Sequence, residues 1–221
     1  MHLSLAVVRH CRRSLVRPAF AQAVGAIVLA ALAGCGSTPS PNLYLIPSPT
    51  LVTAGPNTTH PAAHTVEDPG AFLLAVADVT LPSYAKDRRI AVQADSAKLA
   101  REEGHRWAAD PEDLVVEALV HRLRARRVDA WPLPLPPPYR ADKTLVVRFD
   151  EFLLHQNSTA QLAGHFAVIN EGRPTVSQPF QLRSGRVDGA GDYAAAVGTV
   201  LDELSGLITA ALEPLPEGTD D

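Results

Sequence analysis

Cysteine is scarce in this sequence, and long hydrophobic runs are absent. Only Cys11 and Cys35 occur among 221 residues, so a chain without its first 34 residues would hold one cysteine and no disulfide, which suits an oxidising compartment. No apolar run reaches the roughly eighteen residues of a membrane-spanning helix, which excludes a polytopic membrane protein. Basic residues are not in excess, and the formal net charge of −4 disfavours nucleic acid as the main partner.

The motifs of common nucleotide-binding and catalytic sites are also missing. The sequence has no phosphate-binding loop of the P-loop or Rossmann type, and no G-x-S-x-G or H-E-x-x-H motif. His60 and His64 lie in a Pro- and Thr-rich stretch, where solvated histidines explain them more simply than a zinc site. His155 and His165 flank a predicted hairpin, either as surface neighbours or as an acid–base pair. We therefore predict no catalytic residue, cofactor or metal.

The amino end has the composition of an export signal. Residues 1–34 contain four arginines and no acidic residue, and an apolar stretch from Phe20 to Leu32 ends in small residues. These are the basic, apolar and small-residue regions of a secretory signal, and we predict a signal peptide over 1–34. A buried amphipathic helix or an uncleaved anchor is the alternative.

The tetrapeptide Leu32-Ala33-Gly34-Cys35 is similar to a bacterial lipobox. It predicts cleavage before Cys35 and lipidation of the Cys35 thiol with acyl chains such as palmitate, and residues 35–42 supply a flexible tether. One acyl chain binds a membrane only weakly, whereas the two or three chains of a bacterial lipoprotein attach it stably. The usual signal for retention in the inner membrane is an Asp directly after the cysteine, but here Gly36 follows it. We therefore expect attachment to the periplasmic face of the outer membrane rather than to the inner membrane.

The rest of the chain is predicted to form one mixed domain over residues 43–213. Asp110, Pro111 and the acidic residues after them predict a helix start, because side-chain capping, an initial proline and negative charge all favour a helix amino end. Apolar residues at helical spacing continue this helix to Leu123 and trace a second helix from Val197 to Leu212. Strands are predicted at 43–46, 72–79, 90–92, 145–149, 161–169 and 176–182.

These elements predict an α+β fold, a two-layer sandwich with two main helices packed on a mainly antiparallel sheet. The long segment 47–70 is predicted as a loop and the proline-rich segment 131–139 as a stiff connector. The acidic tail 214–221 is predicted to be disordered. The four arginines within 122–127 are explained by the dipole at the carboxyl end of the first helix, with lipid phosphates as the alternative partner.

Several features occur in the same order as in a known lipoprotein family. After the lipobox come Tyr44-Leu45, the segment 79–88 and Ile90-Ala91-Val92, and Trp107-Ala108 precedes the first helix. The sequence therefore resembles the ABC-type transport auxiliary lipoproteins, the PqiC-like group, from about Leu32 to Leu212. It departs from them at Ala85, where the family commonly has Leu, and in its long loop and stiff connector. The family-motif residues are Leu81, Pro82, Tyr84, Arg88 and Trp107.

The resemblance implies a non-catalytic component of a lipid-transport system that supports envelope integrity. Its partners would be an inner-membrane permease, an ATPase and an MCE-domain protein that spans the periplasm, with phospholipid as cargo. A homo-oligomeric ring at the outer membrane is implied as well. Two other functions stay open from the sequence, namely a structural or assembly lipoprotein of the outer membrane and, less favoured, a periplasmic hydrolase.

The motif residues have a structural interpretation beside the functional one. Pro82 and Tyr84 would shape and pack a turn, Arg88 would pair with a nearby acidic residue, and Trp107 would be a core residue ahead of a helix. The functional interpretation is that they contact the partner protein or lipid. We favour the structural interpretation for each of them.

Overall fold

The computed structural model describes four stretches of the chain, residues 40–49, 72–126, 128–186 and 192–212. The predicted signal peptide, Cys35, most of the predicted loop 47–70 with His60 and His64, and the acidic tail lie outside them.

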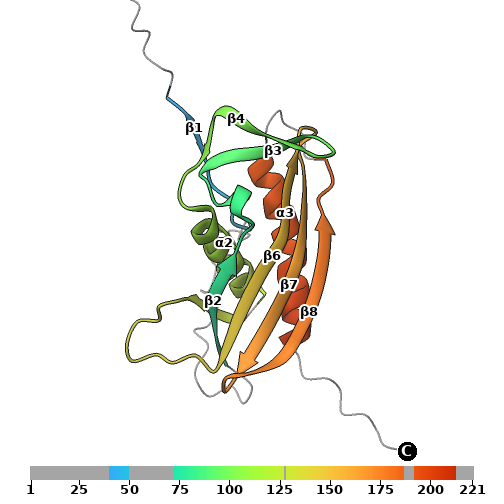
Figure 1. The fold of residues 1–221 in the computed structure, drawn as a ribbon. Helices are drawn as coiled ribbons and strands as arrows, with labels where there is room; N and C mark the ends of the chain where they lie inside the picture. The colour runs from blue at the N-terminus through green and yellow to red at the C-terminus, as the bar shows by residue number, and fades with distance from the viewer. Residues whose placement is uncertain (1–39, 50–71, 127, 187–191, 213–221) are drawn as a thin grey trace, which may run out of the picture. The chain divides into compact units, whose positions relative to one another are not determined.

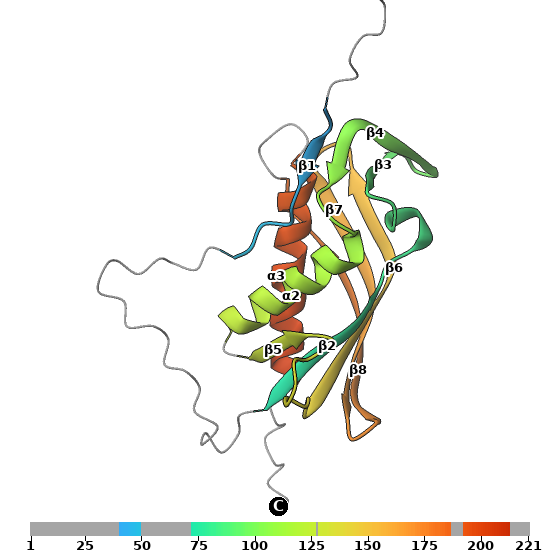
Figure 2. The same ribbon diagram turned by 90° about the vertical axis from the view of Figure 1, so that its left-hand side faces the viewer.

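Within the described residues, one eight-stranded sheet carries two α-helices on one face (Figures 1 and 2). The predicted α+β fold of two helices on a mainly antiparallel sheet is confirmed. A short 3-10 turn, η1 (Ser83–Ala85), links the second and third strands. The strands are β1 (Asn42–Tyr44), β2 (Leu73–Thr80), β3 (Arg89–Asp95), β4 (Lys98–Trp107), β5 (Asp129–Pro132), β6 (Lys143–His155), β7 (Thr159–Asn170) and β8 (Arg173–Arg183), and the helices are α2 (Pro111–Ala125) and α3 (Tyr193–Leu212).

Strand β6 organises the sheet. One of its edges pairs antiparallel with β7, which pairs with β8. These three strands form a meander and contain the strands predicted at 145–149, 161–169 and 176–182. The other edge of β6 is divided between two strands that pair with different parts of its length. Its first half pairs parallel with β2 as far as Arg148, and its end meets β3 at His155. β5 is added beside β2, while β4 and β1 are added beside β3, so β1 and β5 lie near opposite ends of β6 (Figures 1 and 2).

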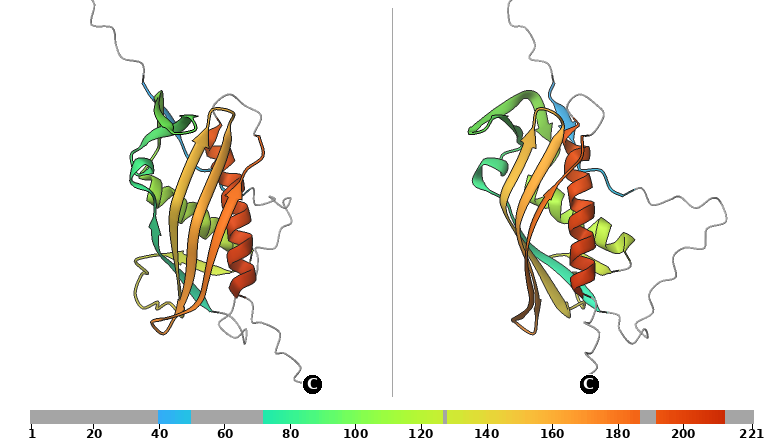
Figure 3. Two further views of the ribbon diagram at one scale, coloured as in Figure 1. Left: turned by 45° about the vertical axis from the view of Figure 1, so that its right-hand side comes forward. Right: turned by 90° about the vertical axis from the view of Figure 1, so that its right-hand side faces the viewer.

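The helices begin where the sequence supplies caps. The Asp110 carboxylate accepts a hydrogen bond from the Glu112 N–H at 3.0 Å, and the Asp192 carboxylate accepts one from the Ala195 N–H at 3.1 Å. α2 packs on β2 and β5, and α3 packs on β7, β8 and α2 (Figure 3). By length and composition α3 could cross a membrane, but its buried residues lie in the hydrophobic core, which accounts for its apolar composition.

Two strands were not predicted from the sequence. β4 carries charged residues on both faces and is largely exposed, so it lacks the alternation that marks a half-buried strand. β5 begins just before the predicted connector 131–139 and ends at Pro132, whose missing N–H is tolerated because β5 lies at an edge of the sheet. The first expected strand, 43–46, is shorter in the structure and ends at Tyr44.

Gly164 on β7 is required by a bulge in β6. The β6–β7 register shifts between Phe149 and Glu151, and this brings the β6 backbone close to Gly164. A side-chain carbon at position 164 would overlap the Arg148 carbonyl oxygen and crowd the Phe149 backbone. The bulge therefore excludes any side chain at this position.

We predict that Gly164→Ala destabilises the protein by about 3 kcal/mol, because the added methyl group overlaps backbone atoms that cannot move aside cheaply. Urea denaturation followed by circular dichroism measures the effect. Gly185→Ala is the matched control, since a methyl group there meets open space and should leave stability unchanged. Equal stability of both variants would contradict the role of the bulge.

Candidate functional site

The family-motif residues are gathered at one place, which we call the motif corner and define as residues 81–88 together with Trp107. The segment leaves β2, passes through η1 and enters β3, and Trp107 ends β4 beside it. Leu81 and Trp107 are buried, and Pro82 and Tyr84 are half-buried. The structure therefore brings together Leu81 and Trp107, which are 26 positions apart in the sequence.

Tyr84 fills the gap in the divided edge of β6. Neither β2 nor β3 pairs with β6 between Arg148 and His155. In that interval the Tyr84 hydroxyl accepts a hydrogen bond from the Phe152 N–H at 3.0 Å. Burial raises the pKa of the Tyr84 hydroxyl, and the nearby Glu151 carboxylate raises it further. A neutral hydroxyl thus stands in for the missing strand partner of a β6 amide.

Arg88 binds backbone carbonyl groups, so the expectation that it pairs with an acidic residue is wrong. Its Nε donates to the Trp107 carbonyl at 3.1 Å, and its Nη2 donates to the Ala108 carbonyl at 2.6 Å. In return, the Trp107 N–H donates to the Arg88 carbonyl at 2.7 Å. These contacts occupy the carbonyls where β4 leaves the sheet. A guanidinium has several donors in a fixed geometry and can serve both carbonyls at once.

The start of the motif is tied to helix α2. The Leu81 N–H donates to the Glu112 carboxylate at 2.9 Å, and Lys86 Nζ lies 3.0 Å from the same carboxylate oxygen. The Pro82 carbonyl accepts from the Ala85 N–H at 2.8 Å and closes the turn of η1. Motif contacts therefore join β2, α2, β4 and β6. Within the motif corner the structure leaves Ser83, Lys86 and Arg88 exposed.

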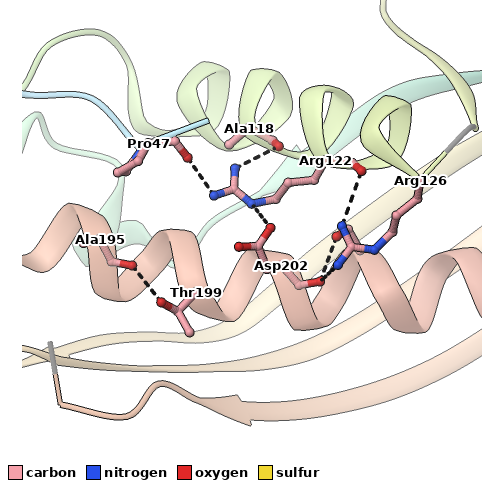
Figure 4. Close-up of polar contacts among 8 residues, drawn as sticks. Pro47, Ala118, Arg122, Arg126, Ala195, Thr199 and Asp202 are labelled. Carbon is pink, nitrogen blue, oxygen red and sulfur yellow. Dashed lines mark hydrogen bonds and ion pairs between the residues drawn. The ribbon is translucent and has the colours of Figure 1, made fainter. Parts of the chain in front are cut away.

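Arg122 is buried between the two helices, whereas the sequence suggested that it interacts with the helix dipole or with lipid phosphates. Only 1% of the residue is exposed. Its Nε lies 3.0 Å from the Asp202 carboxylate of α3, and its Nη2 donates to the Pro47 carbonyl at 2.7 Å (Figure 4). Burial lowers the pKa of Arg122, while the Asp202 carboxylate opposes that shift. One guanidinium thereby joins α2, α3 and the segment after β1.

The neighbouring residues make room for this contact. Gly198 lies one turn before Asp202 on α3, and a side-chain carbon there would come within 3.1 Å of the Arg122 guanidinium. Arg126 Nη2 donates to the Asp202 main-chain carbonyl at 2.8 Å (Figure 4). The sequence did contain a signal for the burial of Arg122, because this residue continues the apolar stripe of Val115, Ala118 and Leu119 at helical spacing.

Arg124 and the proline-rich connector form a separate cluster at the β5 end of the sheet. The Arg124 guanidinium lies 4.6 Å from the centre of the Trp131 ring, and its Nε donates to the Ala130 carbonyl at 2.6 Å. Trp131 stacks on Tyr139 with 6.0 Å between ring centres. The arginines at 122, 124 and 126 are thus all engaged with protein groups, and Arg127 lies outside the described residues.

The two hairpin histidines are not brought together. His155 is in register with Thr159, whereas His165 is in register with Arg148 farther along the hairpin. His165 Nδ1 lies 3.2 Å from the exposed Asp150 carboxylate, and burial lowers the pKa of His155. An acid–base pair between them is therefore excluded. In the described part of the chain, no three His, Cys, Asp or Glu side chains cluster as metal ligands would.

The sequence model of the ABC-type transport auxiliary lipoprotein component matches residues 53–209, more than half of the chain. The chain belongs to this family. The resemblance stated from the lipobox and the motif segment is confirmed. No curated protein matches the chain significantly.

Solved structures confirm the fold of this ABC-type transport auxiliary lipoprotein component. An uncharacterized protein is 16% identical with a TM-score of 0.61, over 79% of this chain and all of its own. A Xanthomonas campestris protein of the DUF330 family is 19% identical with a TM-score of 0.50, over 78% of this chain and 93% of its own. At these identities the likeness concerns the fold alone.

We predict that removing the carboxylate of Asp202 costs this lipoprotein more stability than removing the charge of Arg122. Asp202→Ala leaves the buried guanidinium without its counter-charge and should lower the free energy of unfolding by about 2 kcal/mol. The loss stays this small because 44% of the Asp202 side chain is exposed to solvent. Arg122→Met keeps an apolar stem and removes the buried charge, at about 1 kcal/mol or less. Urea denaturation compares them, and a larger loss for Arg122→Met would contradict the account of the ion pair.

We predict that Tyr84→Phe destabilises the fold by about 1–2 kcal/mol, because the Phe152 N–H loses its acceptor in a partly buried place. The ring and its packing stay, so the loss reports the hydroxyl alone. Tyr139→Phe is the matched control, since Tyr139 is exposed and its hydroxyl has no hydrogen-bond partner among the described residues. Equal midpoints in urea for both variants would show that the hydroxyl has no structural role.

Proposed function

We propose that the chain is a lipoprotein anchored through Cys35 to the periplasmic face of the outer membrane. It would serve as a non-catalytic auxiliary subunit of an MCE- and ABC-type lipid-transport system that supports envelope integrity. The observation that carries the proposal is the family match over residues 53–209. The lipobox at Leu32–Cys35 and the absence of acid after Cys35 support the anchor and its membrane.

The contacts of the described domain support a non-catalytic role. The polar side chains of Tyr84, Arg88, Arg122 and Arg126 each bind protein groups and so hold elements together. We propose that the motif residues Leu81, Pro82, Tyr84, Arg88 and Trp107 act in this structural way. Binding to a partner would then use the exposed side chains around the motif corner.

The proposed partners are those that membership of the family implies. An ATPase and a permease in the inner membrane would supply energy, and an MCE-domain protein would span the periplasm to this lipoprotein. Phospholipid is the proposed cargo, and a homo-oligomeric ring is the proposed assembly.

We predict that chemical cross-linking in intact envelopes, followed by purification of this lipoprotein and mass spectrometry, recovers an MCE-domain protein with its permease and ATPase. Cys35→Ala is the control, because the variant keeps the folded domain and loses the anchor, so recovery should fall at least tenfold. Recovery of a β-barrel or cell-wall component alone would contradict the transport role. That outcome would instead support a structural or assembly lipoprotein.

A further inference from the structure

Two leucines next to the predicted anchor are exposed to solvent. Leu43 on β1 is 59% exposed, and Leu45 just after it is 63% exposed. Tyr44 between them is half-buried, and Ile46 is buried in the core. Successive side chains of an extended segment point to opposite sides. Leu43 and Leu45 therefore share one side, and that side faces away from the core.

The inner side of this part of the sheet is closed by contacts. The Tyr44 hydroxyl lies 2.7 Å from His105 Nδ1, and the two rings stack with 5.5 Å between their centres. The Tyr193 hydroxyl at the start of α3 donates to the Glu102 carboxylate of β4 at 3.2 Å. Burial, together with this carboxylate, raises the pKa of Tyr193 to about 12. β1 and β4 thus have a fixed inner side against α3.

The outer side carries positive charge beside the leucines. Leu43 is in register with Arg106 on β4, and Arg106 is in register with Arg89 on β3. Register partners lie on the same face of a sheet, so these three side chains form a row. Arg89 is neutralised by Asp87 at 2.7 Å. Arg106 is exposed and makes no ion pair within the described residues.

Chain length keeps this row close to the predicted anchor. Leu43 follows Cys35 by eight residues. A fully extended chain covers at most about 3.5 Å per residue, so Leu43 lies within about 28 Å of Cys35 in any conformation. A lipid on Cys35 would therefore keep Leu43 within about 28 Å of the bilayer surface. Exposed leucine beside an unpaired arginine suits that surface, because acyl chains accept the apolar side chains and phosphates accept the guanidinium.

We propose that Leu43, Leu45 and Arg106 form a second contact with the phospholipid bilayer, beside the lipid anchor. The anchor would keep the protein on the membrane, and this contact would fix which side of the domain faces it. The inference rests on the proposed lipidation of Cys35. The β5 end of the sheet, where Leu133 is 45% exposed, would then face away from the bilayer.

The test uses the full-length chain, processed and lipidated in cells, in vesicles of phosphatidylethanolamine and phosphatidylglycerol. Pro41→Cys places a fluorophore on an exposed residue just before β1, at the spacing that shares a side with Leu43 and Leu45. It is the sole free thiol once the predicted signal peptide with Cys11 has been removed and Cys35 carries its lipid. Quenching by lipids with a nitroxide at the shallow acyl position measures contact with the bilayer. We expect Leu43→Ser with Leu45→Ser to reduce this quenching at least threefold, and Arg106→Gln to reduce it less.

Matched controls separate orientation from simple tethering. The same fluorophore on Leu133→Cys should stay unquenched with or without the leucines. Unfolding midpoints should not change in the double serine variant, because both leucines are exposed. Equal quenching at positions 41 and 133, or no loss in the double variant, would overturn the bilayer contact.

Two further outcomes distinguish this inference from the proposed function. The mass of the mature amino terminus is measured first, and an unmodified Cys35 would overturn the proposed anchor together with this contact. If the chain is lipidated but quenching is the same with and without the two leucines, the bilayer contact alone is overturned. Photo-cross-links from position 43 to a protein in envelopes would then assign the leucines to a protein interface.

Discussion

The buried guanidinium of Arg122 is the contact on which the helical layer depends. It lies between α2 and α3, where Asp202 supplies the counter-charge and the Pro47 carbonyl supplies an acceptor from a third part of the chain. A buried charge tolerates few arrangements, because its counter-charge and the acceptors of its remaining N–H groups must all lie within reach. The helix spacing, the small residue at Gly198 and the path of the chain after β1 are therefore fixed together.

The sheet has a comparable dependence on one side chain. Because β2 leaves β6 before β3 joins it, part of the central strand has no neighbour on that edge. Tyr84 crosses this gap and binds the Phe152 N–H, while Arg88 holds the end of β4 against the same corner. The family motif is thus explained by the need to join two halves of a divided sheet. Its residues hold elements of the fold together, and in the proposed function a partner would bind the exposed surface around them.

Local rules predicted the elements that have strong local signals. The Asp110 cap and first-turn carboxylates identified α2, and alternating apolar residues identified the β6–β7–β8 meander. β4 was missed because a strand exposed on both faces has no apolar period. The partners of Arg88 and Arg122 are backbone carbonyls and a distant helix, which no local pattern encodes. The possible acid–base pair of His155 and His165 was wrong, because the distance between them depends on the register of a long hairpin.

The sheet and the helical layer are both linked to the segment that follows the proposed anchor. From Pro41 onward, the chain is held first by the β1–β4 ladder and then by the contact between Pro47 and Arg122. With Cys35 lipidated as proposed, force on the anchor enters the sheet through β1 and the helical layer through Arg122. Both layers would therefore share the load. Tension on the proposed anchor would thus reach the sheet and the helices together, rather than the end of a single strand.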